Sequence, residues 1–306
     1  MIRSPKSLAL AFIVAFGTLA SGWQTATDKV TAIPLTMPNK AGSLKFGVLG
    51  DFGTGEPEQY QMAAQMARVY QSFKFELMIL VGDNLYGSER PQDYVRKFEE
   101  PYKPLLDAKV DFYATLGNHD DPNQRLYKPF NMNGERYYTF TKGPIRFFVL
   151  DSNYMDLAQL SWLEGELKKS TEQWKMAYFH HPMYSSGGRH GSEVDLRDEL
   201  EPLFLKYGMD VVFAGHEHFY ERIRPQKGIH YFTCGGGAKL REGDVVRSPL
   251  TAAAFDTDRS FMLAEVSAET FRFQTISRLG KKVDEGTFAL GPEPKRPSGV
   301  PSSNGQ

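Results

Sequence analysis

Five short apolar stretches of the sequence each end in an aspartate, asparagine or histidine, and in four of them a glycine comes just before that residue. The stretches are Leu44–Gly50, Leu77–Val81, Val110–Leu116, Lys175–Phe179 and Asp210–Phe213. The side chains that follow them are Asp51, Asp83, Asn118, His180, His216 and His218. Because ligands of α/β proteins bind at the carboxyl ends of strands, five strands with such ends indicate one shared site.

The rest of the pattern predicts the fold. Four more strand-like runs are Ile145–Leu150, His230–Cys234, Phe261–Val266 and Thr270–Ile276. Helical spacing of apolar residues predicts helices over Pro57–Phe73, Leu157–Leu167 and Val194–Leu205. No repeat or linker interrupts the sequence between Leu44 and Arg278, so we expect one domain. The predicted class is α/β, a four-layer α/β/β/α sandwich of two mixed β-sheets flanked by helices.

The composition of the chain excludes several classes of protein. The formal net charge is −1, so no nucleic-acid partner is indicated. Cys234 is the single cysteine, which excludes an intramolecular disulfide and a cysteine-based zinc site. Composition also excludes a wholly disordered chain, a coiled coil and a polytopic membrane protein, and it gives no indication of oligomeric state.

The two ends of the chain differ from the middle. Arg3 and Lys6 precede an apolar run from Leu8 to Ala20, which is typical of a signal peptide. Cleavage would leave an exported protein, periplasmic or secreted, without stable membrane insertion. An uncleaved N-terminal anchor is the alternative. From Gly291 the chain is rich in Pro, Ser and Gly, which predicts a disordered tail.

The polar side chains at the strand ends, together with Tyr86, form a plausible metal-binding set. Oxygen and imidazole donors without thiolates suit Mg, Mn, Zn or Fe. Seven donors are too many for one ion with room for substrate, and they suit two ions that share a carboxylate. Two ions about 3.5–4 Å apart can clamp an in-line displacement, the geometry that phosphate-ester hydrolysis needs. Each motif alone is weak evidence, and the joint order and spacing carry the inference.

The order Gly-Asp, Gly-Asp, Gly-Asn-His-Asp, strand-end His and Gly-His-x-His resembles the calcineurin-like metallophosphoesterase superfamily. Most of that superfamily has Asp-x-His in the first segment, where this chain has Gly53 in place of the histidine. The second segment adds Tyr86. This variation is similar to the purple (tartrate-resistant type) acid phosphatases, above all to their small single-domain branch. The resemblance extends over about Phe46–Ile276.

The resemblance implies two metal ions, Fe(III) and a divalent ion that is Fe, Zn or Mn in the family. Asp83 would bridge them. The ligands implied for Fe(III) are Asp51, Asp83, Tyr86 and His218. The ligands implied for the second ion are Asp83, Asn118, His180 and His216.

The doubled histidine leaves the fourth-segment ligand ambiguous by one residue. We favour His180 over His181, because the family ligand stands two residues before a proline and Pro182 fits that frame. The glycines at 235–237 lack the lysine and hydroxyl residue of a P-loop, so they predict a tight turn.

Three further residues are candidates for catalysis by the same resemblance. His119 would lie beside the leaving group as a proton donor or phosphate contact. His190 would be an outer-sphere acid or phosphate contact, with an exposed loop histidine as the alternative. Asp120 would orient a histidine, or it is a plain loop acid. Glu217 and His230 are interpreted as structural or solvent-facing.

These features predict an exported dinuclear-metal phosphatase that hydrolyses phosphomonoesters, small phosphate esters, by in-line attack of a metal-bound hydroxide. One alternative is a phosphodiesterase or nucleotide hydrolase of the same superfamily, and another is a catalytically inactive binding protein on the same fold. The predicted organisation is a signal peptide (1–26), an N-terminal linker (27–43), a metallophosphoesterase domain (44–280) and a disordered C-terminal tail (281–306).

Overall fold

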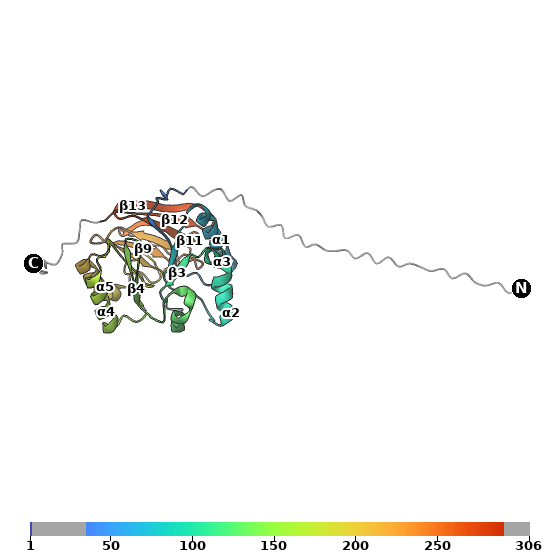
Figure 1. Cartoon of the computed structure of the whole chain (residues 1–306), viewed down its shortest axis with the longest axis horizontal. Helices are drawn as coiled ribbons and strands as arrows, with labels where there is room; N and C mark the ends of the chain where they lie inside the picture. The colour runs from blue at the N-terminus through green and yellow to red at the C-terminus, as the bar shows by residue number, and fades with distance from the viewer. Residues whose placement is uncertain (2–34, 291–306) are drawn as a thin grey trace, which may run out of the picture. The chain divides into compact units, whose positions relative to one another are not determined.

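The computed structural model describes Met1 and residues 35–290 of the chain. Within residues 35–290, two β-sheets pack face to face and helices cover the outer face of each sheet (Figure 1). Both sheets contain parallel and antiparallel pairs. The predicted α/β/β/α sandwich of two mixed sheets is therefore confirmed.

The first sheet has six strands in the order β13-β12-β11-β1-β2-β3. Their bounds are β1 (Leu44–Leu49), β2 (Leu77–Leu80), β3 (Asp111–Ala114), β11 (Ser260–Val266), β12 (Thr270–Ser277) and β13 (Lys282–Ala289). Strands β1, β2 and β3 are parallel, and β11, β12 and β13 pair antiparallel beside them. The carboxyl ends of the three parallel strands consequently meet at one edge.

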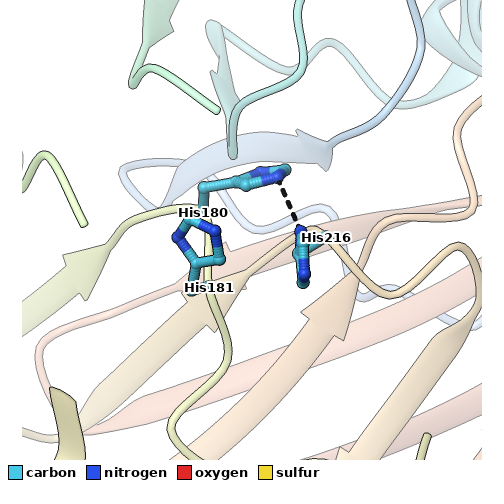
Figure 2. A group of neighbouring side chains, drawn as sticks. All are labelled: His180, His181 and His216. Atoms are coloured by element: carbon cyan, nitrogen blue, oxygen red, sulfur yellow. Dashed lines mark hydrogen bonds between the residues drawn. The ribbon is translucent and has the colours of Figure 1, made fainter. Parts of the chain in front are cut away.

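The second sheet has seven strands in the order β10-β8-β9-β7-β6-β5-β4. Their bounds are β4 (Tyr138–Lys142), β5 (Ile145–Val149), β6 (Trp174–Tyr178), β7 (Val211–Ala214), β8 (Tyr220–Ile223), β9 (His230–Cys234) and β10 (Thr251–Phe255). Strands β5, β6, β7 and β9 are parallel. The loops after β6 and β7 therefore emerge side by side and carry the histidines of Figure 2.

The helices are α1 (Pro57–Ser72), α2 (Pro91–Tyr94), α3 (Glu100–Asp107), α4 (Leu157–Lys169) and α5 (Val194–Tyr207), joined by the π-helical segment η1 (Val95–Glu99) and the 3-10 turns η2 (Pro122–Leu126) and η3 (Lys128–Phe130). The three predicted helices correspond to α1, α4 and α5. Helices α2 and α3 were not among them: α2 has only four residues, and Pro101 and Pro104 break up the helical pattern of α3.

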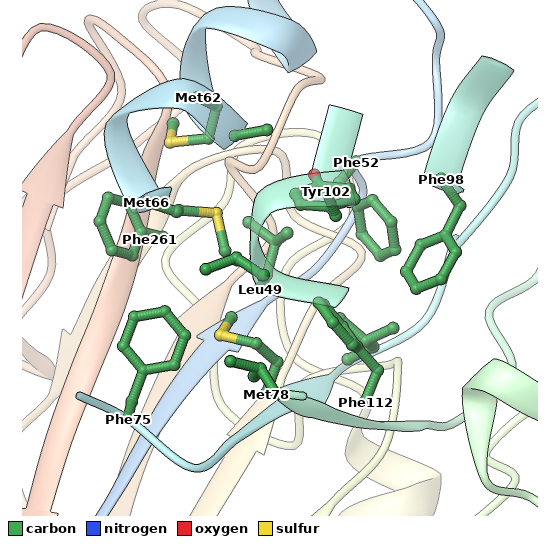
Figure 3. Close-up of a cluster of buried hydrophobic side chains, with 14 of the residues drawn as sticks. Leu49, Phe52, Met62, Met66, Phe75, Met78, Phe98, Tyr102, Phe112 and Phe261 are labelled. Carbon is green, nitrogen blue, oxygen red and sulfur yellow. The ribbon is translucent and has the colours of Figure 1, made fainter. Parts of the chain in front are cut away.

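Apolar side chains fill the space between the sheets and beneath the helices. Between the sheets, the ring of Phe46 contacts the edges of Phe147 and Phe213 at centroid distances of 5.6 and 6.1 Å. Figure 3 shows the cluster under α1 and α3, where Met62 and Tyr102 pack on the outer face of the first sheet. Each fully buried side chain of this size stabilises the fold by about 1.5–3 kcal/mol. The core thus holds both sheets and their polar edges in place.

Two predicted boundaries are wrong. Residues 282–289 were expected in the disordered tail, yet they form β13, which pairs with β12 over its length. The ring of Phe288 stacks on His230 at 3.5 Å. As a half-exposed edge strand with charged residues among its apolar ones, β13 resembles a polar tail in sequence.

The predicted linker also belongs partly to the domain. Met37 is buried, and the backbone N–H groups of Asn39 and Lys40 donate to the Glu265 carboxylate. Apart from Met1, the predicted signal peptide lies outside the described residues, as does the tail from residue 291. Among the helices of residues 35–290, none has the length and apolar character needed to cross a bilayer.

Candidate metal centre

The loops that follow the parallel strands bring the predicted ligands to one edge of the sandwich. Asp51 and Asp83 follow β1 and β2 of the first sheet, and His216 follows β7 of the second. All three have positive φ values, of 55°, 50° and 67°. Aspartate and histidine are enriched in this otherwise uncommon backbone region, and strained residues cluster at functional sites. The turns therefore direct side chains from both sheets to a common point.

The first cluster contains four of the predicted ligands. Tyr86 Oη lies 3.1 Å from Asp51 Oδ1 and 3.2 Å from His218 Nε2. His218 Nε2 lies 3.3 Å from Asp51 Oδ1. Asp51, Asp83 and His218 each offer a ligand atom within 4.8 Å of the others'. This convergence brings together the four residues that the resemblance implies as ligands of one ion.

The second cluster contains the other predicted ligands. Asn118 Oδ1 lies 3.0 Å from both His180 Nε2 and His216 Nδ1. His180 Nδ1 lies 3.0 Å from the carbonyl oxygen of Val81, so Nδ1 donates there and Nε2 faces the cluster without a proton. Asp83 Oδ1 lies 3.4 Å from His180 Nε2, which brings Asp83 against both clusters as a bridging ligand requires.

The buried carboxylates of the site require cations to balance their charge. Asp51 and Asp83 are 0% and 1% exposed. Burial, followed by the charge of Asp83, raises the pKa of Asp51 well above its usual range. Two buried carboxylates this close are unfavourable unless a cation compensates them. Hard oxygen and imidazole donors suit iron, zinc and manganese, so the residues present fit a pair of such ions.

The pKa values of His216 and His218 also favour metal binding. Burial, and then the neighbouring His180, lowers the pKa of His216 to about 2. Burial, and then Arg241, lowers the pKa of His218 to about 3. Both imidazoles are therefore neutral at physiological pH, the form in which a nitrogen lone pair binds metal.

Figure 2 shows His180 and His181 beside His216. The three residues each offer a nitrogen within 4.8 Å of the others. His181 Nδ1 lies 2.9 Å from Ser152 Oγ, and its ring centroid is 4.5 Å from that of His216. His180 contacts Asn118 and Asp83 directly, which supports the choice of His180 and leaves His181 at the edge of the second cluster.

His119 and His190 lie at the rim of the site. The His119 ring centroid is 5.1 Å from that of Tyr86, and the His190 ring stacks on His216 at 4.3 Å. Both side chains are exposed. They are thus next to the clusters without belonging to them.

Asp120 lies in the loop after β3, and its carboxylate bonds backbone groups instead of orienting a histidine. Among residues 35–290 it makes no hydrogen bond to a histidine side chain. Its carboxylate accepts backbone N–H groups of Gly117 at 2.8 Å, Leu85 at 3.0 Å and Asn84 at 3.1 Å. Asp120 therefore ties the loop after β2 to the loop after β3, and through them it fixes Asp83 and Asn118.

Gly53 explains the missing histidine of the first segment. A Cβ built on this residue would lie 1.8 Å from the carbonyl oxygen of Asn84. The loops after β1 and β2 approach so closely that no side chain fits there, and Tyr86 supplies a donor to the same cluster.

Two cations that the sequence did not indicate lie beside the site. Arg241 Nη1 lies 3.1 Å from Glu217 Oε2, and Lys239 Nζ lies 4.7 Å from the centre of the Tyr86 ring. Both follow the glycines at 235–237, and no sequence motif marks them. Glu217 itself is fully buried, in agreement with its interpretation as structural.

A cleft of about 440 Å³ opens beside the second cluster. Its walls include Asn118, His181, Ser152, Arg136 and Tyr154. Arg136 is paired with the buried Asp151 at 2.8 Å, so its charge is already neutralised. The cleft therefore offers space for the part of a substrate that lies beyond the metal clusters.

Two mixed sheets with buried carboxylates and imidazoles at their shared carboxyl edge define a metallophosphoesterase. The model of the calcineurin-like phosphoesterase family matches residues 44–220, more than half of the chain. The chain belongs to this family, and it is a metal-dependent phosphoric ester hydrolase.

Several relatives place the chain near the purple acid phosphatases. It is 26% identical over 252 residues to purple acid phosphatase 17 of Arabidopsis thaliana, covering 69% of this chain and 72% of that protein. It is 31% identical over 216 residues to acid phosphatase type 7 of Mus musculus, covering 60% and 48%. The predicted resemblance to purple acid phosphatases is confirmed.

Solved structures share the fold at lower identity. GAP50, the anchor in the inner membrane complex of Plasmodium, superposes with a TM-score of 0.71 at 19% identity, covering 83% of this chain and 90% of that one. Purple acid phosphatase PPD1 from yellow lupin (Lupinus luteus) seeds superposes with a TM-score of 0.69 at 18% identity, covering 83% and 55%.

Proposed function

We propose that this protein is an exported dinuclear phosphatase that hydrolyses phosphomonoesters by in-line displacement at phosphorus. The observation that carries the proposal is the pair of ligand clusters that meet at Asp83, with Asp51 on one side and His180 on the other. This arrangement, and the family to which the chain belongs, support a two-ion site.

The ligand assignment follows the two clusters. Asp51, Tyr86 and His218 would hold Fe(III), Asn118, His180 and His216 would hold the divalent ion, and Asp83 would bridge them. Two bound ions would supply a nucleophile at neutral pH and neutralise charge on the phosphate. Carboxylates and a phenolate are hard anionic donors, which supports Fe(III) in the first position.

The rim histidines, His119 and His190, would donate a proton to the leaving group. His119 lies against the Tyr86 ring of the first cluster, and His190 lies against the His216 ring of the second. A positioned general acid typically contributes about 10²–10⁴-fold to the rate. Their exposure leaves both imidazoles accessible to a bound ester.

Two alternatives remain distinct from this proposal. The same site could prefer phosphodiesters or nucleotides, since the cleft beside Asn118 has room for a second substituent. An inactive binding protein on this fold is the other, and the anchor GAP50 has a similar fold. Loss of one or more ligands would be expected of an inactive protein, whereas all seven predicted ligands converge here.

The test compares a phosphomonoester with a matched phosphodiester, using mature protein loaded with iron and zinc across a range of pH. Strong preference for the monoester supports the proposal. Preference for the diester would be consistent with the proposed metal site but would change the proposed substrate class to phosphodiesters. Absence of turnover on either ester by fully loaded protein contradicts a catalytic role. Export is tested separately, by locating the full-length protein after cell fractionation.

A further inference from the structure

We propose that Arg241 binds the substrate phosphate and recognises the second negative charge of a phosphomonoester, and that Glu217 is the positioning residue that holds Arg241 in place. This inference rests on the proposed phosphatase function and deepens it. It assigns monoester specificity to a side chain that is not a metal ligand.

The first step of the argument is the buried carboxylate of Glu217. It is 0% exposed and lies in the loop between His216 and His218. It accepts the backbone N–H of Gly191 at 2.9 Å and Arg241 Nη1 at 3.1 Å. A buried charge without such partners would be strongly unfavourable, so Glu217 fixes both the loop of His190 and the guanidinium.

The second step is the location of the guanidinium. Arg241 Nη1 lies 3.2 Å from His190 Nδ1 and 3.4 Å from the carbonyl oxygen of His216. The backbone N–H of Arg241 donates to the carbonyl oxygen of His218 at 3.1 Å. Arg241 is therefore anchored to the loop that carries one ligand of each cluster, next to the face on which His190 lies.

The third step is the donors that remain free. All the hydrogen bonds that the side chain of Arg241 makes with residues 35–290 involve Nη1. Nε and Nη2 have no such partner there, and the side chain is 18% exposed. A guanidinium is permanently charged and presents its donors as a planar fork that matches phosphate oxygens. Its free edge is suited to one phosphate.

The fourth step is charge. Above a pH of about 6 a phosphomonoester carries close to two negative charges, whereas a diester carries one. A fixed cation beside the metal ions therefore stabilises bound monoester more than bound diester. Lys239 adds a second positive charge at the site, over the Tyr86 ring.

The experiment measures kcat and KM for p-nitrophenyl phosphate and bis(p-nitrophenyl) phosphate at neutral pH, with metal content checked for each protein. For Arg241→Gln we expect kcat/KM for the monoester to fall by about 10–100-fold and that for the diester by less than about threefold, as loss of a charged hydrogen bond implies. Inorganic phosphate should inhibit the variant more weakly, by a similar factor to the monoester loss. Arg241→Lys, which keeps the charge without the fork, should lie between.

Glu217→Gln tests the positioning role. We expect the ratio of kcat/KM for the monoester to that for the diester to fall, by less than in Arg241→Gln, while the metal content stays at two ions. Arg68→Gln is the matched control, because Arg68 is an exposed arginine of helix α1 that bonds Gln65 in the same helix. Its kinetics should stay within about twofold of wild type.

Equal losses on both esters, or unchanged inhibition by phosphate, would overturn the inference. If the wild type hydrolyses neither ester, the proposed function fails on its own. In that case, calorimetry can still test whether Arg241 binds phosphate. The Kd of inorganic phosphate is compared between metal-loaded wild type and the variants, and an unchanged Kd in Arg241→Gln or Arg241→Lys would contradict a phosphate contact.

Discussion

The backbone N–H of His119 donates to Oδ1 of Asp83 at 2.9 Å. The same oxygen lies 3.4 Å from His180 Nε2. The carboxylate proposed to bridge the metal ions thus also holds the loop that carries a proposed proton donor. Metal binding and placement of His119 are therefore coupled through one side chain.

Asp83→Asn should have the largest effect of any single ligand substitution. Both ions depend on this carboxylate, and an amide is a weaker and neutral donor. We expect metal content to fall below one ion per chain and the rate on a phosphomonoester to fall by at least about 10³-fold. Elemental analysis and steady-state kinetics measure both, with Asp107→Asn as a surface control. Retention of two ions and wild-type activity would sink the ligand assignment.

Tyr86→Phe tests the phenolate ligand by colour. An Fe(III)–phenolate pair absorbs visible light, so the oxidised, iron-loaded wild type should be coloured. The Tyr86→Phe variant should be colourless at equal iron content, whereas Tyr70→Phe, at a half-buried tyrosine of α1, should keep the colour. Visible absorption spectra decide the question, and colour that persists in Tyr86→Phe rules this ligand out.

Asp120→Ala should destabilise the fold and loosen metal binding together. The carboxylate accepts backbone N–H groups from two ligand loops, and its loss leaves these donors without their partner. We expect a loss of about 2–4 kcal/mol in the free energy of unfolding. Thermal unfolding with and without chelator measures it. A variant with normal stability and normal metal affinity would show that the two loops keep their structure without the Asp120 carboxylate.

Gly53→Ala should be strongly destabilising, because its Cβ would meet the Asn84 carbonyl oxygen at 1.8 Å. We expect a loss of about 3 kcal/mol and reduced metal content. Gly165→Ala is the matched control, since nothing lies within 4 Å of a Cβ on this residue in α4. That change should stabilise the protein by about 0.5–1 kcal/mol. Equal chemical denaturation curves for the two variants would contradict the close contact.

His230 should make stability depend on pH. Burial, and then Arg222, lowers its pKa to about 4, below the ordinary value of 6.5. The unfolded chain therefore takes up the proton first as the pH falls, so this contribution is fully present above pH 6.5 and is lost towards pH 4. Partial exposure limits it to at most about 2 kcal/mol. Denaturation of His230→Phe and wild type at several pH values tests this: their stability difference should change with pH only between those limits.

Much of the fold and site could be predicted because short-range patterns specify them. Apolar runs such as Leu77–Leu80 are buried along their whole length, and their identity as strands needs no distant partner. The ligands follow these strands within a few residues. Asp51 and His218 lie far apart in sequence and follow strands of different sheets, and the packing of the two sheets brings their loops to the same edge.

Other features depend on contacts that no local pattern encodes. Strand β13 is stable because Phe288 stacks on Phe271 of the neighbouring strand β12 and on His230, which is far from it in sequence. Asp120 and Arg241 are ordinary loop residues until the fold brings backbone donors or a buried carboxylate against them. Their roles follow from tertiary packing, which hydrophobic periodicity does not report.

Each metal cluster takes ligands from both sheets, since Asp51 and Asp83 belong to the first sheet and His218 to the second. A fragment that ends before residue 218 would have carboxylates and no complete site, however well its strands formed. Metal uptake would consequently report on the docking of the two sheets during folding. The order in which ions and sheets come together could then be followed by the metal's own spectrum as the chain refolds.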